Sequence, residues 1–212
     1  MNRKFISKSN LVLRKVLNST DNLDIIKNFI ETFLSIEIVK IRLNPYLQKR
    51  ADYLPAEENF GIADVRILTK EQEEYNIGIQ IIDGFYVQNK LLLYYAQIHT
   101  NQLLYEENKK IAKTITINIL DFNYFKSKEY HKKIFVKNPQ LDTNIIEKIE
   151  MHIIELTKFS NNAQKDLTNK SAWMNYLVGK NASIINTIKK EFVYIRKLDN
   201  LLEEFWNNER ME

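Results

Sequence analysis

Residues Ile62 to Ile82 read IADVRILTKEQEEYNIGIQII, and they are the most informative segment of this chain. Two strand-like runs flank a charged turn, and this pattern predicts a β-hairpin. Side chains alternate across a strand, so Asp64 on the first strand and Gly78 and Gln80 on the second belong to the polar side of the hairpin. The other side is apolar and is expected to pack on the core. The hairpin therefore predicts polar groups held on a rigid sheet, which is a suitable frame for a preorganised site.

The segments around the hairpin predict an α/β protein with a mixed sheet flanked by helices. Strands are expected at 36–43 and 114–122, with an edge strand near 130–137. Helices are expected at 21–36, 85–106, 144–158, 169–178 and 183–207. The long helix at 85–106 is expected to make a parallel crossover between strands. We expect no strand after about residue 140, and we divide the chain into a domain at 1–160 and a helical C-terminal extension at 161–212.

The composition is that of a globular protein, because 44% of the residues are apolar and 27% are charged. The sequence has no cysteine, which excludes a disulfide framework and a thiolate metal site in these residues. The segment MNRKFISKSN lacks the apolar core of a signal peptide, and no stretch reaches the roughly 18 apolar residues of a membrane span. We therefore expect a cytoplasmic protein. A net charge of +4 permits a nucleic-acid partner without requiring one.

The chain resembles the PD-(D/E)XK nuclease family transposases, which are related to the recombination-promoting nucleases of bacteria. Asp64 and Gln80 match the Asp and the Gln of that family's hairpin, which reads Asp on one strand and Glu-X-Gln on the next. Further matches follow in the family's order. They are SKSNLVLRKVL at 7–17, LYYAQIHTNQL at 93–103, and the E-L-x-K segment made by Glu155, Leu156 and Lys158.

The resemblance covers about residues 7–160 and implies a restriction-endonuclease-like fold that acts on DNA with Mg²⁺. It implies that Asp64 is a catalytic metal ligand and that Gln80 is its catalytic partner. A protein partner or a homo-oligomer remains open.

Three positions depart from the family's pattern. Gly78 stands where the family has its metal-binding Glu, Asn10 where it usually has an Asp, and Leu91 where it usually has an Arg. Glycine has no side-chain oxygen, and Mg²⁺ in proteins usually needs one or two carboxylates. We therefore expect a catalytically impaired nuclease; the alternative is a non-catalytic interaction or regulatory protein that keeps the fold as a scaffold. Candidates for a replacement carboxylate are Glu31, Glu37, Glu58 and Asp83.

Purely structural interpretations of the same residues stay open. Asp64 is, in that case, an exposed carboxylate paired with Arg66 or Lys70, and Gln80 is a surface residue. The tyrosines at 94–95 lie at helical spacing with apolar neighbours, which favours core packing. A basic C-terminal segment is either a phosphate-contacting surface or, as we prefer, a solvated helix face; its members are Lys180, Lys189, Lys190, Arg196 and Lys197.

The three histidines, at 99, 131 and 152, lack the sequence spacing of a metal site. His152 lies on the apolar stripe of the helix expected at 144–158. We therefore interpret it as a partly buried side chain whose hydrogen bonds are satisfied.

Overall fold

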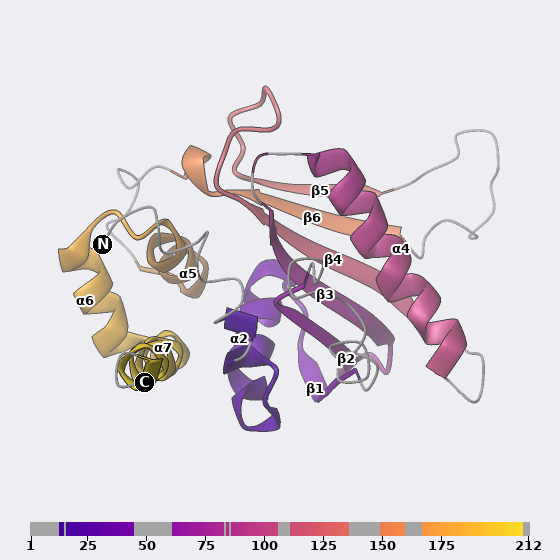
Figure 1. Cartoon of the computed structure of the whole chain (residues 1–212), viewed down its shortest axis with the longest axis horizontal. Coiled ribbons are helices and arrows are strands. Elements are labelled where there is room, and N and C mark those ends of the chain that lie inside the picture. Colours follow the sequence, from indigo (N-terminus) through magenta and orange to yellow (C-terminus); the bar gives the residue numbers. More distant parts are fainter. Residues whose placement is uncertain are drawn as a thin grey trace.

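The computed structural model describes residues 13–14, 16–44, 61–82, 84, 86–105, 111–135, 149–159 and 167–209. Its centre is a six-stranded mixed sheet with the strand order β1-β2-β3-β4-β6-β5 (Figure 1). The strands are β1 Ile38–Leu43, β2 Ala63–Thr69, β3 Glu74–Ile82, β4 Lys113–Leu120, β5 His131–Phe135 and β6 Ile149–Glu155. The helices are η1 Thr20–Asn22, α2 Leu23–Leu34, α4 Val87–Tyr105, η3 Leu156–Lys158, α5 Asn169–Val178, α6 Ala182–Glu191 and α7 Val193–Glu209.

The predicted hairpin is present as β2 and β3, which pair antiparallel with Asp64 directly opposite Gly78. Helix α4 then leads to β4, which pairs parallel with β3, so the predicted parallel crossover is confirmed. The other predicted elements confirmed within a few residues are α2, β1, α5 and the edge strand β5. The helix predicted at 183–207 is two helices, α6 and α7, separated at Phe192.

The expectation of a helix near 144–158, with no strand after residue 140, is wrong. Residues 149–155 form β6, which pairs parallel with β4 and antiparallel with β5. The sequence IEMHIIE fits both a short helical stripe and an alternating strand, and its β-branched isoleucines favour the strand when β4 offers a partner. Residues 144–148 of the expected helix lie outside the described residues.

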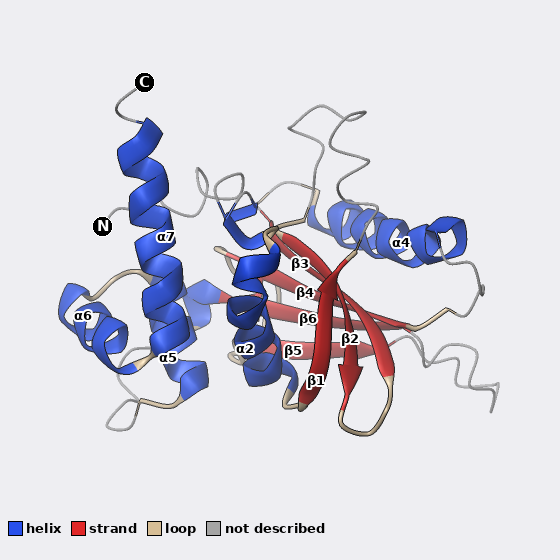
Figure 2. Ribbon diagram, turned by 90° about the horizontal axis from the view of Figure 1, so that it is seen from below, coloured by secondary structure: helices blue, strands red, loops and turns tan. Residues whose placement is uncertain are grey.

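Helices cover both faces of the sheet (Figure 2). On one face, α4 packs on β3 and β4. On the other, α2 packs on β1 and is contacted by α5 and α7, which share its apolar core. The predicted apolar side of the hairpin lies in this core; its residues are Ala63, Val65, Ile67, Ile77, Ile79 and Ile81. The domain division at residue 160 stays a prediction. Among the described helices, none has the length and hydrophobicity needed to span a membrane.

The basic C-terminal segment is partly neutralised by ion pairs. Lys189 Nζ contacts Asp199 and lies 3.3 Å from Glu203 Oε1. Lys197 Nζ lies 2.8 Å from Asp24 Oδ1 on α2. These contacts support the interpretation of a solvated helix face and tie α7 to α6 and α2.

Candidate functional site

Asp64 and Gln80 lie on the sheet face that α4 covers, and both are buried, with exposed fractions of 2% and 1%. The interpretation of either one as an exposed surface residue is therefore wrong. Asp64 also does not pair with the two suggested cations. Arg66 Nη2 lies 2.6 Å from Glu74 Oε2 and Lys70 Nζ lies 2.8 Å from Glu37 Oε2.

Asp64 is instead held by a cluster of amide side chains. Asn44 Nδ2 donates to Asp64 Oδ1 and to Asn76 Oδ1. The backbone N–H of Asn44 donates to the Asp64 carbonyl at 3.1 Å, and Asn76 Nδ2 donates to the Ile98 carbonyl in α4 at 3.2 Å. The cluster thus joins the end of β1, both strands of the hairpin and the covering helix. The sequence indicated this cluster only weakly, because the alternation of the strand places Asn76 on the same side as Gly78 but does not show that Asn76 meets Asn44.

Burial raises the pKa of Asp64 to about 7, although the hydrogen bond from Asn44 favours the charged form and opposes this rise. The cause is desolvation, because a buried carboxylate loses its hydration, and none of the described residues forms an ion pair with Asp64. Burial therefore favours the protonated form of Asp64 more than in the free side chain.

Gly78 lies directly beneath α4. A Cβ atom there would lie 2.0 Å from Ile98 Cδ1 and 2.6 Å from Tyr94 Oη, both too close for real contacts. The Tyr94 hydroxyl lies 3.2 Å from the carbonyl oxygens of Ala63 and Ile79, so it is anchored on the hairpin backbone. Tyr94 is buried, as its predicted packing role requires. The space beside Asp64 is thus occupied by a phenol and an isoleucine.

The Gln80 side chain is committed to the neighbouring strand. Its Nε2 donates to Asn118 Oδ1 at 2.6 Å, and Asn118 Nδ2 in turn donates to the His152 carbonyl at 3.0 Å. The Gln80 amide therefore fixes β3 to β4 and, through Asn118, to β6.

The described residues provide no complete set of side-chain ligands for a Mg²⁺ ion. Among the described residues, no three His, Asp or Glu side chains are arranged to hold a metal ion. Glu31 accepts from the Ile38 N–H and Glu37 pairs with Lys70. Ile38 pairs with Thr69, at the far end of β2 from Asp64, so neither acid supplies a second ligand. The other positions named from the sequence, Asn10, Glu58 and Asp83, lie outside the described residues.

The E-L-x-K segment performs a structural task that the sequence did not reveal. Glu155 is fully buried, and its Oε1 accepts from the backbone N–H groups of Tyr124 at 2.5 Å and Phe125 at 3.1 Å. Lys158 Nζ lies 2.5 Å from Glu155 Oε2 and donates to the Phe125 carbonyl at 2.6 Å. This buried ion pair therefore holds the loop at 121–130, which connects β4 to β5.

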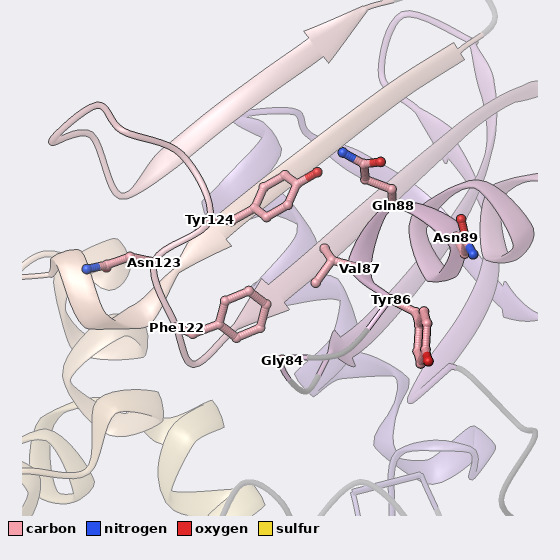
Figure 3. Close-up of a pocket in the computed structure, with 8 residues that line it drawn as sticks. All are labelled: Gly84, Tyr86, Val87, Gln88, Asn89, Phe122, Asn123 and Tyr124. Atoms are coloured by element: carbon pink, nitrogen blue, oxygen red, sulfur yellow. The ribbon is translucent and has the colours of Figure 1, made fainter.

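A pocket of about 480 Å³ opens between this loop and the start of α4, beyond the ends of β3 and β4 (Figure 3). Its lining residues are Gly84, Tyr86, Val87, Gln88, Asn89, Phe122, Asn123 and Tyr124. In Figure 3 the Tyr124 side chain extends toward Gln88, Phe122 and Val87 lie beside them, and Asn123 points away. The pocket combines aromatic rings with side-chain amides.

A second buried polar cluster lies on the opposite face of the sheet. His152 Nε2 lies 2.7 Å from Glu150 Oε1, and His152 Nδ1 lies 2.9 Å from His131 Nε2. Lys113 and Lys133 each lie 2.7 Å from the Glu150 carboxylate. The sequence missed this cluster because the expected helix at 144–158 separated two histidines that β5 and β6 bring together.

The family of the chain follows from comparison with known proteins. The sequence model described as PD-(D/E)XK nuclease family transposase matches residues 8–212. Nucleases of this family typically use a divalent metal, and the family suggests DNA as a partner. No curated protein and no solved structure matches the chain. The match spans nearly every residue and agrees with the mixed sheet flanked by helices, so the chain belongs to the PD-(D/E)XK nuclease family transposases.

Proposed function

We propose that this protein binds DNA and cuts it poorly or not at all. One observation carries the proposal: Tyr94 and Ile98 occupy the space beside Asp64 where a ligand side chain from position 78 would stand. A metal ion needs that space as well as the missing carboxylate. Buried side chains fill the space, and Gly78 supplies no carboxylate. Neither requirement for metal-assisted hydrolysis is therefore met at this position.

The charge state of Asp64 supports the same conclusion. A Mg²⁺ ligand must be a carboxylate anion, and burial raises the pKa of Asp64 to about 7, which disfavours that anion. Its Oδ1 already accepts from Asn44, and the Gln80 amide already donates to Asn118. Both remnants of the family's site are engaged in holding the fold.

The direct test is a cleavage assay on plasmid and oligonucleotide DNA with Mg²⁺ or Mn²⁺. We expect no cleavage by the native chain. Gly78→Glu should also fail, because its side chain meets Ile98 and Tyr94. Adding Ile98→Ala and Tyr94→Ala to Gly78→Glu clears the space, and cleavage gained in that variant should be lost again with Asp64→Ala. Strong native cleavage that Asp64→Ala abolishes would refute the proposal.

DNA binding requires its own measurement on the same samples. We expect the affinity for duplex DNA to fall steeply with salt, because contacts to phosphates release counterions. The absence of binding at low salt would instead favour the alternative function, an interaction or regulatory protein that keeps the nuclease fold as a scaffold.

A further inference from the structure

We propose that the pocket between the start of α4 and the loop at 121–130 binds one unpaired nucleobase. This inference rests on the proposed action on DNA and adds the form of DNA that is recognised. No residue of the pocket belongs to the Asp64 cluster, so base binding does not depend on metal-assisted cutting.

The chemistry of the lining suits a base. Tyr124 and Phe122 lie on the loop side, and Gln88 and Asn89 lie on the first turn of α4 (Figure 3). Bases outside a duplex are recognised by stacking on aromatic rings and by hydrogen bonds to their edges. Gln and Asn amides present a donor and an acceptor together, which matches a base edge. The volume of about 480 Å³ lies within the roughly 300–1,000 Å³ typical of small-ligand pockets.

The pocket is preorganised by the buried ion pair described above. The Glu155 carboxylate accepts from the N–H groups of Tyr124 and Phe125, so it holds the backbone that carries the stacking ring. The Tyr124 and Phe125 rings also meet edge to face, with centroids 4.9 Å apart. A ring held in advance costs less conformational entropy on binding.

Two cations lie on the same loop. Lys126 and Lys128 are exposed, and neither is paired with a carboxylate of the described residues. They follow Tyr124 by two and four residues, so they are candidates for contacts with the phosphates next to a bound base. A base within a duplex is stacked and cannot enter such a pocket unless it is extruded. The recognised form is therefore single-stranded DNA or a duplex with an unpaired base.

The test is anisotropy and fluorescence with oligonucleotides that contain 2-aminopurine, whose emission is quenched when it stacks. We expect quenching with single-stranded DNA and with a duplex that has one unpaired base, and none with a blunt duplex. Tyr124→Ala should weaken single-strand affinity roughly 5- to 140-fold, the loss expected for one base-aromatic stack. Tyr124→Phe keeps the ring and should stay near native.

Matched variants separate base recognition from general effects. Phe135→Ala removes an exposed ring on β5, outside the pocket, and should change nothing. Gln88→Ala changes an exposed side chain at the pocket and should alter the preference among bases without altering the melting temperature. Lys126→Gln should lower the slope of log affinity against log salt by about 0.7 if it contacts one phosphate.

The outcomes separate this inference from the proposed function. Single-strand binding that is unchanged in Tyr124→Ala, or a preference of the native chain for blunt duplex, would overturn the base pocket and leave DNA binding intact. Binding of a nucleoside monophosphate that Tyr124→Ala abolishes, with no oligonucleotide bound, would support base recognition and refute the action on DNA. No binding of any of these probes would overturn both.

Discussion

Replacing Asp64 by Asn should stabilise the protein at neutral and alkaline pH. The pKa of Asp64 is about 7 in the folded state against 3.8 for the free side chain, because burial disfavours the anion. The folded state thus holds a proton more tightly than the unfolded chain does, and native stability falls as pH rises from 3.8 to 7. The difference of about 3 pKa units corresponds to about 4 kcal/mol at 1.36 kcal/mol per unit.

Asp64→Asn removes this cost and keeps an oxygen that can accept from Asn44. The new amide N–H groups carry a penalty of their own, about 1–3 kcal/mol if they stay unpaired, but that penalty does not change with pH. The informative quantity is therefore the stability difference between variant and native chain at pH 8, minus the same difference at pH 4. We expect it to approach 4 kcal/mol in favour of the variant, measured by urea unfolding at several pH values.

Two measurements decide whether this reasoning holds. Asp121→Asn changes an exposed aspartate and should leave stability within about 0.5 kcal/mol across the range. Mg²⁺ should not raise the unfolding midpoint of the native chain, because the described residues bring no group of three carboxylate or imidazole ligands together. A stability difference that is constant with pH would refute the buried-carboxylate argument. Stabilisation by Mg²⁺ in the native chain and not in Asp64→Asn would identify a working metal ligand.

Three further predictions concern packing, pH and the loop. Gly78→Ala should destabilise the fold by about 1–3 kcal/mol through overpacking against α4, whereas Gly84→Ala, whose Cβ would meet its nearest atom at 4.0 Å, should be neutral in thermal melts. Burial, together with neighbouring cations, lowers the pKa of His131 from 6.5 to about 4. The free energy of unfolding should therefore fall as the pH drops from 6.5 to about 4. His131→Gln should reduce this pH dependence, measured by urea unfolding at several pH values. Glu155→Gln should weaken the hydrogen bonds from the backbone N–H groups of Tyr124 and Phe125 and speed amide hydrogen exchange at 121–130. Unchanged exchange would show that the Glu155 carboxylate does not hold this loop.

Much of the fold was predictable from local patterns. The alternation at 62–82 specifies the hairpin, because the pattern lies within one segment. The parallel crossover follows from the order strand, long helix, strand along the chain. β6 was missed because seven residues of mixed pattern do not separate strand from helix. Its pairing with β4 is a contact between distant segments, which no local pattern contains.

The burial environment of Asp64 and Gln80 was not predictable from the sequence, and their role in a site stays a prediction. The sequence places Asp64 and Gln80 on one side of the sheet, which is correct. It could not show that Tyr94 lies over Gly78, because that contact depends on how α4 crosses the sheet. The same limit hid the role of Asn44, which comes from the end of β1 and meets Asp64 only in three dimensions.

The position of β6 imposes an order on the folding of the nascent chain. β5 is made before β6, yet β6 is the strand that joins it to the sheet. Until residue 155 has been synthesised, β4 is the open edge of the sheet, although seven of its eight residues are buried in the finished protein. An unpaired edge of this kind invites pairing with another chain. Truncations that end before β6 are therefore expected to aggregate during synthesis.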